Sequence, residues 1–251
     1  MMEFSPELIL LALVFAAFVA GFIDSIAGGG GLITVPALIL AGFPPVTALG
    51  TNKLQSLFGS GSATFAYASK GHVDLKSQGP TFLISAAFSA LGAWVATQVS
   101  SEWLRNFLPV LMIAIGLYFL LKPSISDESR AARMTPLLFA ATAVPAIGFY
   151  DGIFGPGTGS FFMLAFVMLA GHGLLKATAH TKTLNFASNI GAFAIFAYAG
   201  AIDWKAGVLM GAAQFFGART GAHFAMNRGA KIIKPLLVTV CFALAARLLF
   251  T

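Results

Sequence analysis

Two stripes of polar side chains within long apolar stretches are the part of this sequence best suited to chemistry. They share the spacing i, i+3, i+7 and lie 129 residues apart: Lys53, Ser56 and Ser60 form the first, and Lys182, Asn185 and Asn189 form the second. In a helix this spacing places three side chains on one face. Each face then carries an ammonium group beside amide or hydroxyl groups, a donor set suited to a small anion.

The residues next to the two lysines strengthen this interpretation. Asn52 and Thr181, each directly before its lysine, add further donors. An ionised lysine near the centre of a membrane span costs at least about 2.5 to 3.5 kcal/mol on insertion scales, so two at equivalent positions need a reason. We expect both lysines to face an anionic substrate. Two alternatives stay open: the lysines snorkel to the membrane interface, or they form structural ion pairs with Asp24 or Asp151.

A carboxylate followed by a glycine-rich break also occurs twice. The sequence GFID, which ends at Asp24, recurs as GFYD, which ends at Asp151, and glycine-rich residues follow at 28–31 and 155–159. Glycine lets the chain turn sharply, and a half-helix that begins at such a turn offers free N–H groups to an anion. Close helix packing through small residues is the alternative. The residues expected to line the substrate site here are Gly29, Gly30, Gly157 and Thr158.

Four residues are candidates for coupling or gating. Asp24 and Asp151 are carboxylates beside the glycine breaks, Arg219 is a further charge within an apolar stretch, and His180 lies close to the second stripe. Histidine is the side chain that most readily handles protons near neutral pH. No His, Asp, Glu or Cys cluster has the spacing of a metal site, and no cofactor motif is present, so we expect neither a metal nor a cofactor.

The composition places these residues in a membrane protein. Of the 251 residues, 58% are hydrophobic and 10% are charged, and the mean hydropathy is +0.86. Soluble domains carry about a quarter charged residues. The single cysteine, Cys241, excludes a disulfide scaffold. The net charge of +6 comes from basic residues between apolar runs, which is not a nucleic-acid-binding pattern. Soluble, disordered and nucleic-acid-binding classes are therefore excluded, and a lipid bilayer is the expected surrounding.

We predict an all-α polytopic membrane protein with ten hydrophobic segments: 7–27, 32–42, 46–69, 79–100, 104–122, 135–153, 159–171, 175–199, 205–226 and 230–250. The segments form two transmembrane repeats, 1–122 and 135–251, joined by a polar linker at 123–134. The glycine-rich breaks make some of these helices broken or re-entrant. We expect residues 7–27 to stay in the membrane, not to be a cleaved signal peptide, because they carry Asp24, which the second half repeats.

The basic residues predict an orientation. Because each repeat has five segments, an odd number, the two repeats are expected to be inverted relative to each other. Nine basic residues fall on one side: Lys70, Lys76, Lys122, Arg130, Arg133, Lys176, Arg228, Lys231 and Lys234. Three fall on the other: Arg105, Lys205 and Arg247. The richer side, which includes the linker, is predicted to be cytoplasmic.

These residues together resemble the sulfite exporter TauE/SafE-type family. The resemblance rests on residues 21–36 (GFIDSIAGGGGLITVP), 48–53 (ALGTNK) and 71–76, and on their second-half echoes, including 182–189. It covers nearly the whole chain. It implies a transporter of the bacterial inner membrane with two related halves, which moves sulfur-containing anions such as sulfite, sulfonates or related oxyanions.

We therefore expect a secondary transporter that moves a small anion by alternating access. No ATP-binding motif is present, so any driving force comes from a gradient or a partner, and a proton or another ion is a candidate coupling partner. A passive anion channel and a non-transporting membrane assembly factor remain as alternatives. An enzyme is not expected, because no base is spaced to activate a serine such as Ser160. The sequence leaves substrate, direction, coupling ion and oligomeric state open.

Overall fold

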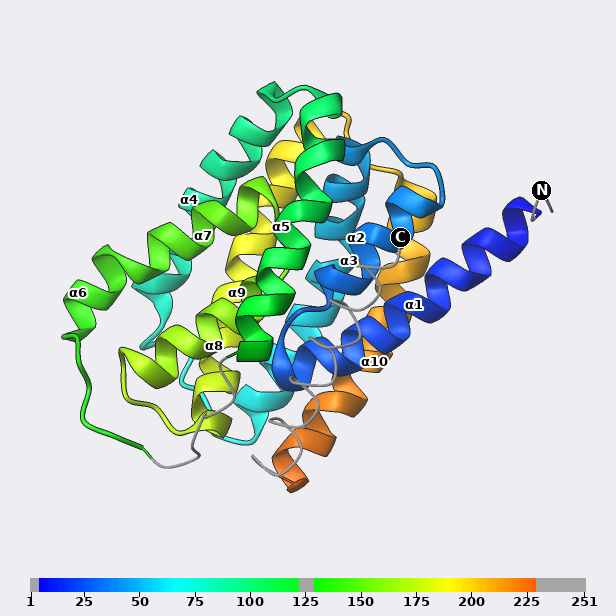
Figure 1. Ribbon diagram of the computed structural model, residues 1–251. Helices are drawn as coiled ribbons and strands as arrows, with labels where there is room; N and C mark the ends of the chain where they lie inside the picture. Colours follow the sequence, from blue (N-terminus) through cyan, green and yellow to red (C-terminus); the bar gives the residue numbers. More distant parts are fainter. Residues whose placement is uncertain (1–4, 122–128, 229–251) are drawn as a thin grey trace.

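The computed structural model describes residues 5–121 and 129–228, and both ranges are helical without a strand (Figure 1). The helices are α1 Pro6–Ala27, α2 Gly31–Leu40, α3 Pro45–Ser69, α4 Gly79–Gln98, α5 Ser101–Leu121, α6 Pro136–Ala141, α7 Ala143–Ile153, α8 Thr158–Met168, α9 Leu174–Tyr198 and α10 Trp204–Arg228. The all-α prediction is confirmed for these residues. The predicted segment 230–250, the last residue of segment 104–122 and linker residues 123–128 lie outside the described residues.

The helix boundaries follow the predicted segments with one exception. Residues 135–153, predicted as one segment, form two helices that meet at Thr142, whose φ of −124° and ψ of −66° are not helical. Pro145 has no N–H to donate to the carbonyl of Ala141, so the backbone ladder is interrupted at this point. The two predicted glycine breaks are confirmed, because three residues separate the end of α1 from the beginning of α2 and four separate the end of α7 from the beginning of α8.

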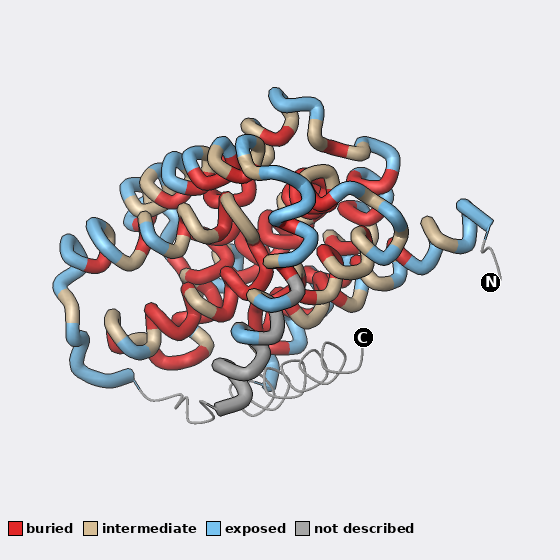
Figure 2. Tube along the Cα trace, turned by 45° about the horizontal axis from the view of Figure 1, so that its top comes forward, coloured by how far each residue is buried: buried red, intermediate tan, exposed pale blue. Residues whose placement is uncertain are grey.

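The outer surface of the helices suits lipid. Three described stretches are long and apolar enough to cross a membrane: Pro6–Ala27, Gly79–Gln98 and Pro136–Ile153. Large hydrophobic side chains on these stretches are exposed, with Phe15 at 68% and Leu137 at 81% of their full accessible area. Figure 2 shows the buried residues gathered in the interior and the exposed ones along the outward helix faces. Apolar side chains of this size on the outside of so many helices indicate a membrane protein.

Helices α3 and α9, which carry the two predicted stripes, run antiparallel through the centre. A Cβ added at Gly50 would contact Phe196, whereas one added at Gly61 would contact Phe186, so residue numbers rise along α3 as they fall along α9. Helices α1 and α10 lie together on one side of this pair, and α4 and α7 lie together on the other (Figure 1). The short helices α2 and α8 sit next to the central pair.

Small residues let the flanking helices approach closely. A Cβ at Gly217 of α10 would lie 2.1 Å from the carbonyl oxygen of Phe18 in α1, and a Cβ at Gly92 of α4 would lie 2.1 Å from that of Phe149 in α7. No real Cβ atom fits at such distances, so both helix pairs depend on glycine for their contact. Packing through small residues therefore explains these glycines, which lie outside the two breaks.

Helices of one half pack mainly against helices of the other half, and these contacts occur in equivalent pairs. Helix α1 packs on α10 as α7 packs on α4, and α3 packs on α10 as α9 packs on α4. Each of these pairs joins an element of the first half to one of the second, and each has a counterpart in which the halves are swapped. The core is consequently shared between the two halves, and neither half encloses it alone.

Candidate functional site

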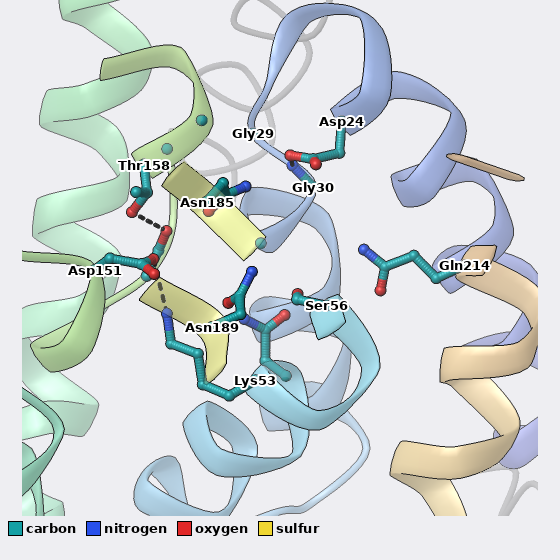
Figure 3. Close-up of a pocket in the computed structure, with 15 residues that line it drawn as sticks. Asp24, Gly29, Gly30, Lys53, Ser56, Asp151, Thr158, Asn185, Asn189 and Gln214 are labelled. Carbon is teal, nitrogen blue, oxygen red and sulfur yellow. Dashed lines mark hydrogen bonds and ion pairs between the residues drawn. The ribbon is translucent and has the colours of Figure 1, made fainter. Parts of the chain in front are cut away.

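A small cavity lies where the two glycine breaks meet (Figure 3). Its lining residues are Asp24, Gly29, Gly30, Gly31, Asn52, Lys53, Ser56, Asp151, Gly155, Gly157, Thr158, Gly159, Asn185, Asn189 and Gln214. The volume is about 20 Å³, room for about one water molecule. Helices from both halves supply this lining. Almost every lining group is polar or is glycine backbone, so the cavity is a polar site enclosed by an apolar protein.

Two ion pairs cross between the halves at this cavity. The Lys53 Nζ of α3 lies 2.7 Å from Asp151 Oδ1 of α7, and the Lys182 Nζ of α9 lies 3.0 Å from Asp24 Oδ2 of α1. Each lysine thus pairs with the aspartate of the other half. Both lysine side chains are at most 1% exposed, so neither snorkels to an interface. Of the alternatives given above, the structure therefore shows ion pairing of the lysines with the two aspartates.

The pair formed by Asp24 and Lys182 is fully engaged. Asp24 Oδ1 accepts a hydrogen bond of 3.1 Å from the N–H of Gly30, at the beginning of α2, and Oδ2 accepts one from Lys182 Nζ. Lys182 Nζ also donates to the backbone carbonyl of Asp24. Asp24 therefore occupies the positive N-terminal end of α2, where an anion is favoured. This pair fixes the end of α1 to the beginning of α2 and to α9.

The pair formed by Asp151 and Lys53 is less engaged. Asp151 Oδ1 accepts from Lys53, but Asp151 Oδ2 is buried and has no hydrogen-bond partner. Within the described residues, the Lys53 ammonium group, which has three N–H donors, has Asp151 as its one ion-pair partner. Lys53 lines the cavity and Lys182 does not. The N–O distances of the two crossed pairs are thus similar, but Asp151 keeps one carboxylate oxygen without a hydrogen-bond partner and Asp24 does not.

The amide of Asn52 presents donors to the cavity. Its Oδ1 accepts hydrogen bonds from Thr34 Oγ1, at 2.6 Å, and from Gln55 Nε2, at 2.9 Å. Because the oxygen is occupied by two donors, the NH₂ group is the part that remains for the cavity. Gly31, whose backbone also lines the cavity, lies beside this nitrogen. Together with Lys53, Asn52 makes this wall rich in hydrogen-bond donors.

The two glycine breaks contact each other directly. Gly28 and Gly157 have φ values of 79° and 83°, in the left-handed region that glycine favours. A Cβ at Gly28 would lie 2.4 Å from the backbone nitrogen of Ser160. Ser160 Oγ in turn donates a hydrogen bond of 3.0 Å to the carbonyl oxygen of Ala27. Ser160 is therefore a residue that joins the two breaks.

The structure brings most of the predicted site residues together. Those that line the cavity are Asp24, Gly29, Gly30, Asn52, Lys53, Ser56, Asp151, Gly157, Thr158, Asn185 and Asn189. Lys182 reaches it through Asp24. Ser60 lies behind the lining, where its hydroxyl accepts from Asn189 Nδ2 at 3.3 Å. Thr181 is buried, and its hydroxyl has no hydrogen-bond partner.

Arg219 and His180, predicted for coupling or gating, lie apart from the cavity. Arg219 is on an exposed face of α10. His180 contacts Gln78 at the beginning of α4 and packs against the ring of His172, with centroids 4.7 Å apart. His172 lies in the loop before α9, where burial and, to a smaller degree, Lys176 lower its pKa to about 4. Among the described residues, no three His, Cys, Asp or Glu side chains come together as metal ligands would.

Gln214 is the lining side chain that the sequence did not predict. It extends from α10 toward the cavity (Figure 3), is 2% exposed, and its Oε1 has no hydrogen-bond partner. It lies against Gly59 of α3, whose missing side chain leaves the space for it. At the repeat offset of 129, Gln214 corresponds to Ser85. A polar residue at both equivalent positions is the feature of the sequence that could have indicated Gln214 as a site residue.

Known proteins resemble this chain over nearly its whole length. The family model described as "Sulfite exporter TauE/SafE" matches residues 13–248. The chain belongs to the sulfite exporter TauE/SafE family. It is 64% identical to "Probable membrane transporter protein ORF9" of Sinorhizobium sp, over 96% of this chain and 92% of that protein. It is 48% identical to "Probable membrane transporter protein YfcA" of Escherichia coli strain K12, over 97% and 90%.

Another family member, "Probable membrane transporter protein" of Haemophilus influenzae, is 46% identical over 96% of this chain and 95% of that protein. These relatives of the TauE/SafE family are named as membrane transporters and not as enzymes. No solved structure matches the chain.

Proposed function

We propose that this protein is a secondary transporter of small anions, sulfur-containing oxyanions such as sulfite or a sulfonate, in the bacterial inner membrane. The observation that carries the proposal is a polar cavity at which both glycine breaks, one lysine and the donors of the two stripes meet. A buried ammonium group attracts an anion by several kcal/mol at an effective dielectric constant of about 20. The amide and hydroxyl donors replace the hydration that the anion loses on entry.

The substrate site in this proposal is the cavity itself. Lys53 supplies the charge, and Asn52, Ser56, Asn185 and Asn189 supply hydrogen bonds. Gly29, Gly30, Gly157 and Thr158 supply backbone at the beginnings of the half-helices, where N–H groups favour anions. With about 20 Å³ free, the cavity is contracted in this structure. An oxyanion of several atoms therefore requires the surrounding helices to move apart.

Two inverted repeats that alternate between open states would provide this movement. The antiparallel course of α3 and α9, the exchanged packing of the flanking helices and the crossed ion pairs support a two-fold relation between the halves. In transporters built this way, the site lies at the interface of the repeats and one repeat moves against the other. The sequence predicts the same inversion from the odd number of segments in each repeat.

The experiment that tests this proposal is counterflow in proteoliposomes. Purified protein is reconstituted, the vesicles are loaded with unlabelled sulfite, thiosulfate or methanesulfonate, and uptake of the same labelled anion is followed. We expect saturable uptake that internal unlabelled anion accelerates. Flux that neither saturates nor responds to internal anion would identify a passive channel. Absence of flux for every anion tested would contradict the transport proposal and favour a membrane assembly factor.

A further inference from the structure

We infer that the two crossed ion pairs have different roles: Asp151 is the carboxylate that takes up a proton when an anion binds to Lys53, whereas Asp24 is a structural residue. The inference rests on the proposed function, because it concerns the same cavity. It assigns the coupling ion, a proton, and a stoichiometry of one proton for each monovalent anion. The reasoning follows from the contacts of each carboxylate and from the charge that the cavity can hold.

The first step is that the two carboxylates differ in their free oxygens. Asp24 accepts from Gly30 with one oxygen and from Lys182 with the other, so both of its oxygens stabilise the ionised form. Asp151 accepts from Lys53 with Oδ1 alone, and its Oδ2 is buried without a partner. A buried carboxylate oxygen with no donor is a place where a proton can be added without breaking a hydrogen bond.

The second step is that an anion and Asp151 compete for the same ammonium group. Lys53 lines the cavity and pairs with Asp151 at 2.7 Å, whereas Lys182 lies outside the lining. An anion that enters the cavity therefore meets Lys53 with an internal carboxylate already bound to it. For the anion to take the ammonium group, Asp151 has to give up its place.

The third step is the charge balance. With both pairs ionised, the two aspartates and two lysines cancel, and the other lining residues are uncharged. A monovalent anion adds one negative charge to a site that is nearly inaccessible to water, which is strongly unfavourable. Protonation of Asp151 restores neutrality: the anion pairs with Lys53, and Asp151 becomes a neutral acid whose O–H can donate to the anion.

Among the residues that the structure describes, no other titratable group is placed to take this proton. Helices α4 and α8 pack against α7 and carry no ionisable side chain. From α3 the facing group is Lys53, and from α9 it is Lys182, which is bound to Asp24 across the cavity. Tyr150, next to Asp151, donates its hydroxyl to the carbonyl oxygen of Pro156 and is turned to that contact. Asp151 is thus the group available for the proton.

The test measures proton uptake on anion binding. The probe is methanesulfonate, because it is monovalent and does not change charge between mildly acidic and mildly basic pH. Binding to the purified wild-type protein is followed by titration calorimetry in buffers of different ionisation enthalpy. We expect uptake of about one proton per anion, and an affinity that rises about tenfold for each unit by which pH falls.

The two aspartates provide matched variants at repeat-equivalent positions. Asp151→Asn is expected to bind the probe with an affinity that no longer depends on pH, because Lys53 has no titrating competitor. Asp24→Asn is expected to lower thermal stability and to keep the tenfold pH dependence. Asp151→Glu keeps a carboxylate and is expected to keep the dependence with a shifted midpoint, which provides a second test if Asp151→Asn does not purify in folded form.

The outcomes separate this inference from the transport proposal. If no probe anion shows counterflow, the proposed function fails. If counterflow is present but the wild-type protein binds the anion without proton uptake, transport stands and the coupling role of Asp151 is overturned. Loss of the pH dependence in Asp24→Asn, with its retention in Asp151→Asn, would reverse the assigned roles and overturn the inference as well.

Discussion

At the scale of single residues, the protein is organised around buried charges that balance one another. Lys53 and Lys182 are among the largest side chains that are completely buried, and each contacts a carboxylate from the other half. Burying an isolated charge is far more costly than burying a matched pair. The sequence already limited the partners to Asp24 and Asp151, but it could not tell which lysine pairs with which, because spacing describes neighbours along one helix and not contacts across two.

A double-mutant cycle tests the balance of charge at Lys53 and Asp151. Lys53→Met and Asp151→Asn each leave one buried charge without its partner, so each is expected to lower the free energy of unfolding by about 3 to 5 kcal/mol. The double variant removes both charges and is expected to recover most of this loss. Thermal denaturation in detergent checks the result. Losses that simply add in the double variant would mean that the two side chains do not interact.

At the scale of helices, the glycine runs and polar stripes predicted the positions of the breaks and most of the lining. Two candidates, Arg219 and His180, do not line this cavity, because composition does not show which way a side chain faces around a helix. Arg219 is five residues after Gln214, about 140° around the helix, so α10 cannot direct both to one cavity. His180 is two residues before Lys182 and is therefore on nearly the opposite face of α9. Arg219 was chosen and Gln214 was missed for the same reason, because a charged residue is more conspicuous in an apolar helix than an amide is.

The contact between the breaks gives a prediction with a matched control. Gly28 and Gly42 both have positive φ, at 79° and 92°, but a Cβ at Gly28 would meet the backbone of α8, whereas one at Gly42 has nothing within 4 Å. Gly42→Ala is expected to cost about 1 to 2 kcal/mol, from backbone conformation alone. Gly28→Ala is expected to cost clearly more. Equal shifts of the thermal midpoint in the two variants would show that the breaks are not packed against each other.

The loop before α9 gives a pH prediction. The pKa of His172 is about 4 in the folded protein and about 6.5 when unfolded. Between these values the unfolded chain binds a proton that the folded one does not, so stability falls as pH falls from about 6.5 toward 4. His172→Phe keeps the ring that stacks on Phe166 and removes this titration. Between pH 6.5 and 4, the thermal midpoint of His172→Phe is expected to fall less than that of His223→Gln, a control at an exposed histidine. An equal fall of the two midpoints with pH would contradict the role of His172.

At the scale of the whole molecule, the two halves contact each other around one cavity through packed helices, close approaches at glycine and ion pairs. Such an arrangement lets a small site be enclosed by both halves and opened when one moves against the other. The repeat visible in the sequence predicted this organisation, but the size of the cavity depends on side-chain packing that no pattern of residue types contains.

Inverted topology can be tested at two repeat-equivalent positions. Lys76 and Lys205 end the corresponding GHVDLK and GAIDWK sequences, and both are exposed. After Cys241 is replaced by serine, single cysteines at these two positions are treated in whole cells with a membrane-impermeant thiol reagent. We expect the Lys205→Cys protein to be labelled in intact cells and the Lys76→Cys protein only after lysis, because the side richer in basic residues is predicted to be cytoplasmic. Identical behaviour of the two would contradict inversion.

The central claim is that a small anion crosses the membrane through the cavity at Lys53. The most direct test is counterflow of the transported anion in proteoliposomes with the double variant Lys53→Met/Asp151→Asn, which keeps the buried charge balanced and so preserves the fold. We predict that this variant has a thermal midpoint close to that of the wild-type protein and has lost saturable uptake. Uptake at the wild-type rate by this folded variant would contradict the account, because the anion would then cross without Lys53.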